Sequence, residues 1–217
     1  MKRFICEQNI AHFERLLSET TTDPNLHRTL LSLLSSARRE LALLNSATAG
    51  ADTLPFEHRR RRLSNAAAIK EQFQPEFDSS PHPYMLLDPG PGLNIVDIND
   101  AYARATFIGR DDVVGKSLFE IFPDNPEDAL ADGVSNLYTS LRTVTQTGRP
   151  HAMAIQRYDI RDPSGEFVER HWQPINTPIH DKNEHVVFLL HHVEDVTEQV
   201  LSSLPVKQSG SDQRRSF

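Results

Sequence analysis

A nearly continuous apolar run near the end of the chain limits the folds that are open to it. Residues 186–190 are Val, Val, Phe, Leu and Leu. Side chains alternate between the two faces of a strand, so this strand is apolar on both faces. It must therefore be covered on both faces and cannot lie half in water. Helices from the middle of the chain can cover one face, and we expect N-terminal helices or a second subunit to cover the other.

Residues 73–200 alternate strand and helix patterns in an order typical of an α+β domain. A helical pattern at 127–148 repeats apolar residues at intervals of three and four, and Asn99 can cap an earlier, shorter helix. We predict one five-stranded antiparallel sheet with the helices on one face. The expected strands span 84–88, 93–98, 153–160, 167–179 and 186–193.

Residues 1–46 are expected to form a helical hairpin before this domain. Asp23 and Pro24 can begin its second helix, since aspartate caps free backbone N–H groups and a proline at the first helical position loses no hydrogen bond. Leucines at 26–44 form an apolar stripe wider than a two-stranded coiled-coil seam. So short a segment does not hold a core alone, so the stripe must dock on the downstream domain or on a second copy.

Residues 47–72 are expected to be a linker with a short lead-in helix at 66–73. The run Arg59–Arg62 permits two interpretations, contact with nucleic acid or an acidic membrane, or a solvated linker. The formal net charge of -7 favours the solvated linker, because nucleic-acid binding needs a surplus of Lys and Arg. Residues 201–217 are polar and expected to be disordered.

Other features argue for a cytoplasmic protein that is not an enzyme. Cys6 is the only cysteine, so no internal disulfide can form, and no stretch approaches the ~20 apolar residues of a membrane span. The sequence contains no glycine-rich phosphate loop, nucleophile elbow, metalloprotease motif or kinase signature. We therefore expect no catalytic residues.

Several short segments, taken in order, resemble a PAS sensor domain over residues 73–200. They are Phe77–Pro81 leading into Tyr84–Leu87, then Ile98–Tyr102, Gly109–Lys116, Trp172 with Asn176–Ile179, and Glu194–Thr197. Residues 122–126 and 156–160 also look like a subgroup common in bacterial signalling proteins. The resemblance implies a cup of sheet and helices whose interior can hold a small molecule, and frequent dimerisation through flanking helices. Only 201–217 follow the domain, so we expect a sensor without an effector of its own.

The resemblance also implies where a ligand would lie. Candidate ligand-binding residues are those on elements around the cup whose strand parity or helical phase is apolar. They are Leu87, Ile95, Phe107, Leu118, Phe122, Leu137, Leu141, Ile155, Trp172 and Leu189.

Cofactor classes of PAS domains can be tested against the residues present. Covalent flavin chemistry needs a cysteine near 107–118, and that segment has none, so this chemistry is excluded. Haem is disfavoured because 127–148 contains no histidine to bind the iron. Non-covalent flavin leaves no reliable motif and is also disfavoured. The cofactor, if there is one, stays unidentified.

The cluster at 191–195 (His-His-Val-Glu-Asp) suggests metal or acid–base chemistry. Strand geometry places His191 and Asp195 on one face and His192 and Glu194 on the other. Two ligands per face fall short of the four in a structural metal site, so we predict none. We expect Asp195 to accept backbone hydrogen bonds where the strand ends. One histidine should line the pocket and the other should contact a covering helix.

These observations leave two hypotheses for function. The first is a sensory module that binds a small ligand, a protein partner or both, and relays its state by protein–protein contact, as a homodimer or with a signalling partner. The second is a ligand-free adaptor or dimerisation protein for a separate signalling enzyme.

Overall fold

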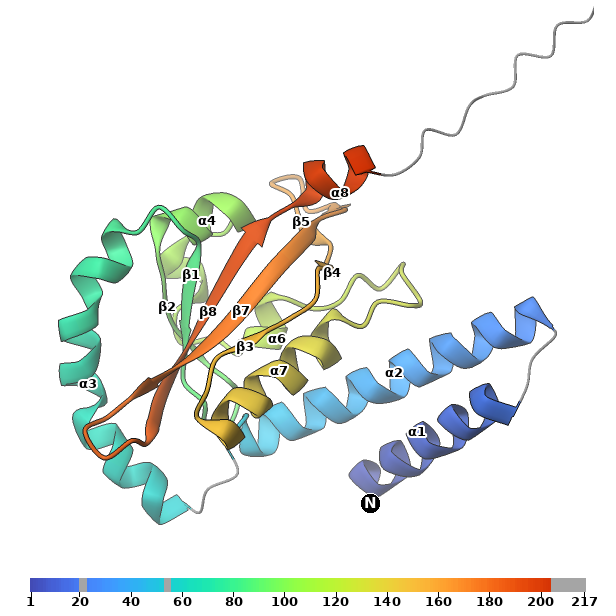
Figure 1. Ribbon diagram of the computed structural model, residues 1–217, viewed down its shortest axis with the longest axis horizontal. Coiled ribbons are helices and arrows are strands. Elements are labelled where there is room, and N and C mark those ends of the chain that lie inside the picture. Colours follow the sequence, from blue (N-terminus) through green and yellow to red (C-terminus); the bar gives the residue numbers. More distant parts are fainter. Residues whose placement is uncertain (20–22, 53–55, 204–217) are drawn as a thin grey trace, which may run out of the picture.

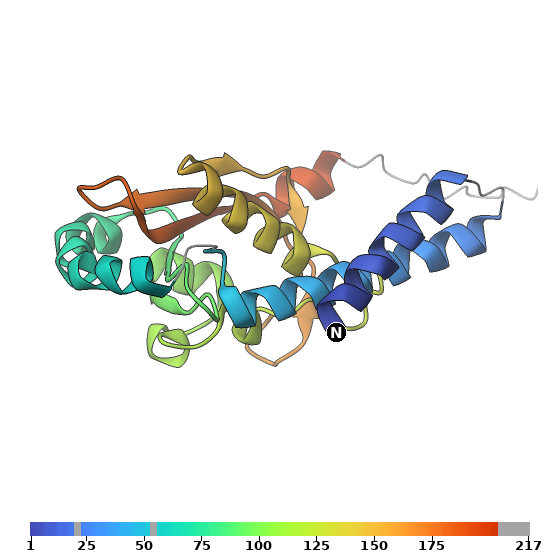
Figure 2. The same cartoon turned by 90° about the horizontal axis from the view of Figure 1, so that it is seen from below.

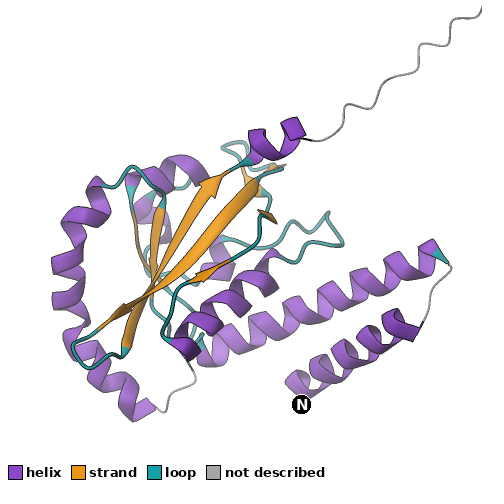
Figure 3. Ribbon diagram, in the orientation of Figure 1, coloured by secondary structure: helices purple, strands orange, loops and turns teal. Residues whose placement is uncertain are grey.

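The computed structural model describes residues 1–19, 23–52 and 56–203 and, for 56–65, the backbone alone. Its helices are α1 (Lys2–Glu19), α2 (Pro24–Ala49), α3 (Phe56–Ser79), α4 (Asp100–Thr106), α5 (Arg110–Val113), α6 (Leu118–Ile121), α7 (Gly133–Thr147) and α8 (Thr197–Ser203). Its strands are β1 (Tyr84–Leu87), β2 (Ile95–Ile98), β3 (His151–Ala152), β4 (Gln156–Arg157), β5 (Ile160–Arg161), β6 (Phe167–Val168), β7 (His171–His180) and β8 (Val186–Asp195). Figures 1 and 3 show the strands gathered at the centre with helices around them.

One antiparallel sheet organises the domain. Its strand order is β2-β1-β8-β7-β3, and β4 also pairs with β7 beside β3. β3 and β4 thus occupy one position, and the sheet is five strands wide. The α+β prediction of one antiparallel sheet with helices is confirmed. β8 lies at the centre, which explains why residues 186–190 are apolar on both faces.

The edge of the sheet beside β7 is interrupted, and the predicted strand 153–160 is therefore wrong as one unit. β3 ends where Ala152 pairs with Ile175, and β4 begins where Gln156 pairs with Trp172. Between them lies Pro174, whose carbonyl accepts from the backbone N–H of Met153 at 2.9 Å. Proline has no N–H to donate in return, so the ladder breaks at this point.

The predicted strand 167–179 also divides. β6 leaves the main sheet and pairs with β5 in a separate two-stranded sheet, and β7 begins only at His171. At the opposite edge, β2 is paired on its outer side by the segment 115–117. There Ile95 N donates to Lys116 O at 2.9 Å, and Gly115 N donates to Ile95 O at 2.7 Å.

The long middle helix begins later than predicted, at Gly133 and not at 127. Side-chain oxygens bind the backbone of the preceding turns, since Asn125 Oδ1 accepts from Glu127 N at 3.0 Å and Asp128 Oδ1 accepts from Leu130 N at 2.9 Å. Such local hydrogen bonds offer the backbone an alternative to the helix. Leu130 consequently lies outside the helix and is 45% exposed.

Helix α3 replaces most of the expected linker. It runs unbroken from Phe56 to Ser79, far beyond the predicted lead-in helix at 66–73. Its apolar side packs on the outer face of the sheet, where Phe77 meets Leu86 and Phe188. This helix, and not the N-terminal hairpin, covers the second face of β8. Pro55 and the side chains of Arg59–Arg62 lie outside the described residues.

The N-terminal hairpin packs on the other side of the domain. α1 and α2 lie antiparallel, and α2 packs on α7, with Ala42 reaching the main core. The predicted start of α2 is confirmed, because Asp23 Oδ1 accepts from Asn25 N at 2.9 Å and Pro24 follows it. Figure 2 shows the far end of the hairpin extending away from the sheet. Helix α1 ends at Glu19, and residues 20–22 lie outside the described residues.

The main core lies between the sheet and helices α4–α7. Asn99 caps α4 as predicted, since its side chain accepts from Tyr102 N. Helix α8 extends to Ser203, three residues into the expected tail, and the disorder predicted for 204–217 lies outside the described residues. Among the described helices, none combines the length and the apolar character needed to cross a membrane.

Candidate functional site

A small cavity lies inside the cup, beneath the sheet. Its volume is about 50 Å³. One water needs roughly 10–15 Å³ of such space, so the cavity fits a few waters or one very small molecule. It is lined by Met85, Tyr102, Thr106, Leu118, Phe122, Gly133, Leu137, Met153, Gln156, Tyr158, Ile160, Trp172, Pro174, His191 and Val193.

Four of the ten candidate residues line this cavity, namely Leu118, Phe122, Leu137 and Trp172. Four others are buried in the same core but do not reach the cavity wall. These are Leu87, Ile95, Leu141 and Leu189, each at most 1% exposed.

The remaining two candidates lie at the surface. Phe107 is 46% exposed because it ends α4 in a left-handed conformation (φ 60°), with its ring beside Arg170. Ile155 is 50% exposed because it falls in the break between β3 and β4. Neither is a cavity residue.

Apolar strand parity and helical phase do not reveal the polar residues of the cavity wall. Tyr102 and His191 are both 4% exposed, and their rings meet at 6.3 Å between centroids. Strand parity would have found Pro174, which shares a face with Trp172 on β7. Gly133 carries no signal in the sequence, yet an added Cβ there would lie 1.9 Å from the Tyr158 ring.

A chain of hydrogen bonds runs from the cavity wall toward the surface. His191 Nδ1 lies 2.7 Å from Asn176 Oδ1, and Asn176 Nδ2 donates to Ser140 Oγ at 2.7 Å. The Ser140 hydroxyl lies 2.8 Å from Nδ1 of the half-buried His151. Because the amide nitrogen of Asn176 donates to serine, its oxygen must accept, and His191 therefore carries its proton on Nδ1.

The electrostatics of the cavity keep its polar groups neutral. Burial lowers the pKa of His191 to about 3, and the neighbouring His192 acts in the same direction. Burial also raises the pKa of the Tyr102 hydroxyl. Within the described part of the chain, neither this hydroxyl nor His191 Nε2 has a hydrogen-bond partner. The wall thus offers the Tyr102 hydroxyl as a donor or acceptor and His191 Nε2 as an acceptor.

This chain of hydrogen bonds ends in a groove between the hairpin and the domain. This groove has a volume of about 740 Å³, and His151 and Ser140 line it together with Leu41 and Asn45 of α2. A continuous polar path therefore joins the interior of the cup to the contact between α2 and α7.

The other residues of the cluster at 191–195 lie as the strand alternation requires. Asp195 Oδ1 accepts from Thr197 N at 2.9 Å just past the end of β8, as predicted. His191 lines the cavity, also as predicted. His192 faces the outer side, but it contacts Glu194 and Tyr84 and not the covering helix that was expected.

The sheet, the helices and the cavity between them form an α+β domain. Residues 77–201 match the protein family described as the PAS fold. The match covers more than half of the chain, and the chain belongs to this family. It is accordingly a member of a family of sensory and signalling modules.

Solved structures of the same fold are similar to this chain at low sequence identity. The PAS domain of a protein from Colwellia psychrerythraea is 15% identical with a TM-score of 0.45, over 60% of this chain and 98% of that one. The PAS domain of Bordetella pertussis BvgS is 18% identical with a TM-score of 0.45, over 61% and 90%. A Rhodobacter sphaeroides LOV protein is 16% identical with a TM-score of 0.46, over 67% and 71%. None of the curated proteins matches the chain.

Proposed function

We propose that this protein is a non-enzymatic signalling module that relays the state of its central cavity to other proteins by contact. The observation that carries the proposal is the hydrogen-bond chain from His191 through Asn176 and Ser140 to His151. Hydrogen bonds in such a buried chain polarise one another, so a change at one end alters the other. The far end lies beside α2, where a partner can read it.

The proposed occupant is a small, neutral, hydrogen-bonding molecule. Pockets for drug-sized ligands or large cofactors measure ≈ 300–1,000 Å³, and this cavity measures about 50 Å³. The hydroxyl of Tyr102 and Nε2 of His191 supply the polar contacts. A charged ligand would be costly to bury here, because neutral His191 and Tyr102 offer it no opposite charge.

The relay requires that the occupant bind two states of the protein unequally. In one state His191 keeps its hydrogen bond to Asn176. In the other, a ligand bound to the imidazole turns the ring and weakens that bond. The α7 side of the groove would then shift relative to α2.

The only tryptophan, Trp172, lines the cavity, so its fluorescence is a built-in reporter. We would titrate the full chain with imidazole and with a set of small alcohols and amides, and record both fluorescence and native mass. Tyr102→Phe removes the cavity hydroxyl without changing the ring. Tyr84→Phe is the matched control, because Tyr84 lies on the outer face of the sheet. A saturable change that Tyr102→Phe weakens and Tyr84→Phe preserves is the expected result.

The relay has its own test. Asn176→Ala interrupts the chain of hydrogen bonds while leaving Tyr102 and His191 in place. We expect probe binding to persist in this variant, while the probe-induced change in amide hydrogen exchange on α2 and α7 is lost. An exchange response that survives in Asn176→Ala would contradict the relay.

The second candidate function is a ligand-free adaptor, which the small volume of the cavity favours. It predicts that no probe changes Trp172 fluorescence and that the native mass equals that of the polypeptide alone.

In both functions, we propose that partners, or a second copy, contact the exposed apolar residues of the hairpin. These include Phe4, Ile5, Leu26 and Leu33, each at least 44% exposed.

A further inference from the structure

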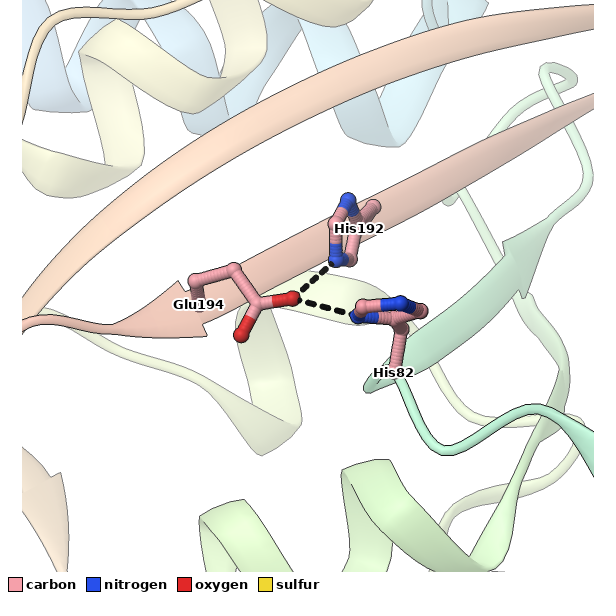
Figure 4. A group of neighbouring side chains, drawn as sticks. All are labelled: His82, His192 and Glu194. Atoms are coloured by element: carbon pink, nitrogen blue, oxygen red, sulfur yellow. Dashed lines mark hydrogen bonds and ion pairs between the residues drawn. The ribbon is translucent and has the colours of Figure 1, made fainter.

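Three metal-binding side chains meet on the outer face of the sheet, away from the cavity. His82 lies just before β1, and His192 and Glu194 lie two residues apart on β8. Figure 4 shows one carboxylate oxygen of Glu194 facing both imidazole rings. Strand parity alone gives only two ligands on this face, because His82 is 112 residues from Glu194 in the sequence.

The distances bring one ligand atom of each residue to a common point. Glu194 Oε1 lies 2.8 Å from His82 Nδ1 and 2.7 Å from His192 Nε2. All three ligand atoms lie within 4.8 Å of one another. Zinc bonds of about 2.0–2.2 Å hold tetrahedral ligand atoms roughly 3.3 Å apart, so each of these two nitrogen–oxygen distances would lengthen by about half an ångström around an ion.

The backbone holds this arrangement independently of the three side chains. Tyr84 pairs with His192 in the β1–β8 ladder, which fixes the start of β1 against the end of β8. The carbonyl of His82 accepts from Asn99 Nδ2 at 2.8 Å, and its N–H donates to Ser80 Oγ at 3.1 Å. The backbone positions of His82 and His192 are therefore held without the hydrogen bonds to Glu194.

Exposure and donor type decide what this cluster can bind. The side chains of His82, Glu194 and His192 are 56%, 44% and 22% exposed, so an ion can enter from solvent and keep an open coordination position. Two imidazole nitrogens and a carboxylate oxygen suit zinc and similar borderline ions, whereas calcium and magnesium prefer oxygen ligands alone.

We propose that His82, His192 and Glu194 form a three-ligand site for a divalent transition-metal ion of the zinc type. The ion bridges the segment before β1 to the end of β8. A fourth position stays open for water or for a side chain of another molecule. The site is separate from the central cavity, because His192 and Glu194 face the opposite side of β8 from His191.

The test uses the full chain without a histidine tag, stripped with a chelator and titrated with ZnCl₂ by calorimetry. Cobalt absorption serves as a second readout of the coordination. We expect one equivalent of zinc to bind. We expect His82→Ala, His192→Ala and Glu194→Gln each to weaken binding by at least about tenfold. Glu194→Gln keeps the size of the side chain, so it separates lost coordination from lost folding.

His12→Ala is the matched control, because His12 is an exposed histidine on α1 far from the cluster along the chain. It should bind zinc like the natural sequence, and so should Tyr102→Phe, which alters only the cavity. The proposal is overturned if zinc fails to saturate one site, or if the three ligand variants bind as tightly as the His12→Ala control.

Discussion

Asn99 joins the first strand, the first helix of the domain and the end of α3 through one buried side chain. Its Oδ1 accepts from Tyr102 N at 2.9 Å and from Tyr84 N at 3.0 Å. Its Nδ2 donates to His82 O at 2.8 Å and to Phe77 O at 3.1 Å. An amide is the side chain that supplies two acceptor and two donor positions in one plane, so this residue does more than cap a helix.

Asn99→Ala should lower the free energy of unfolding by about 2–4 kcal/mol, from a lost cap together with buried groups left unsatisfied. Asn99→Asp keeps the cap but turns the donors into an acceptor that faces two carbonyls. We expect it to be destabilised as well, measured by urea unfolding. Natural stability in Asn99→Asp would mean that only the cap matters.

Asp159 makes the free energy of unfolding depend on pH. Burial raises the pKa of this carboxyl, but hydrogen bonds from Arg157 at 3.0 Å and Asn125 at 2.9 Å outweigh it, so the pKa is lowered on folding. A lowered folded pKa stabilises the fold fully above the ordinary carboxyl value of about 3.9. The stabilisation is lost as the pH falls through the folded value.

Asp159→Asn should therefore cost about 1 kcal/mol at pH 7, a modest figure because Arg157 is half exposed. The difference from the natural sequence should shrink below pH 4, measured by thermal unfolding at a series of pH values. A difference that stays constant down to pH 2 would assign the effect to packing and not to charge.

Among the elements, α2 is anchored to the domain through a polar contact with the turns before α7. Arg39 Nε lies 2.6 Å from Asp124 Oδ2, and its Nη2 donates to Ala131 O at 2.7 Å. Ser35 Oγ donates to the same carbonyl at 2.6 Å. The Asp124 carboxylate also accepts from Val134 N at 2.9 Å, and its side chain is 1% exposed.

Arg39→Ala should destabilise the protein by about 3 kcal/mol, because it leaves a buried carboxylate without its charge partner. A second change, Asp124→Asn, should recover part of that loss, and a double-mutant cycle in urea would measure the coupling. Arg38→Ala is the matched control, since the Arg38–Glu14 pair is about half exposed and should contribute less than 1 kcal/mol. Equal losses in both arginine variants would contradict this account.

The elements that the sequence predicted well are those in which local signals and tertiary packing agree. Asp23 and Pro24 begin α2, and apolar patterns place β1, β2 and β8. Prediction failed where one non-local contact overrides the pattern. Pro174 of β7 has no N–H, and this interrupts the adjacent edge strand between β3 and β4. The apolar pattern of residues 151–157 cannot reveal the interruption, because its cause lies in β7. The sequence of helix α3 predicts a linker, because the helix is stabilised by its contact with the sheet and not by local signals.

For the whole molecule, the cavity and the metal-binding cluster depend on register between distant strands. Strand parity and helical phase place Leu118, Phe122, Leu137 and Trp172 at the cavity wall. The chain from His191 to His151 needs the β7–β8 and β3–β7 pairings, in which Asn176 lies opposite both histidines. No pattern within one segment specifies those pairings, so the sequence predicted the apolar cup but not its polar path.

We expect the full chain to self-associate through the hairpin. Leu26 and Leu33 are 48% and 44% exposed and lie seven residues apart, on one side of α2. The double substitution Leu26→Glu and Leu33→Glu should shift the species seen by sedimentation velocity to the monomer without changing the circular dichroism. Ile155→Glu is the control, because Ile155 is equally exposed but lies on the domain. A protein that is monomeric before substitution would refute the expectation.

The two edges of the sheet limit the ways in which another protein can bind to it. At one edge, β2 is paired with residues 115–117. The other edge consists of β3 and β4, each two residues long and separated where Pro174 of β7 has no N–H to donate. Partners that bind by β-augmentation need a free row of backbone donors and acceptors along an edge strand. Neither 115–117 nor the short strands β3 and β4 leave a long row of this kind. A binding protein would instead recognise side chains, either on the helices or on the part of the outer sheet face that α3 leaves exposed near His82 and Glu194. Recognition through side chains depends on sequence, whereas pairing along a backbone edge does not.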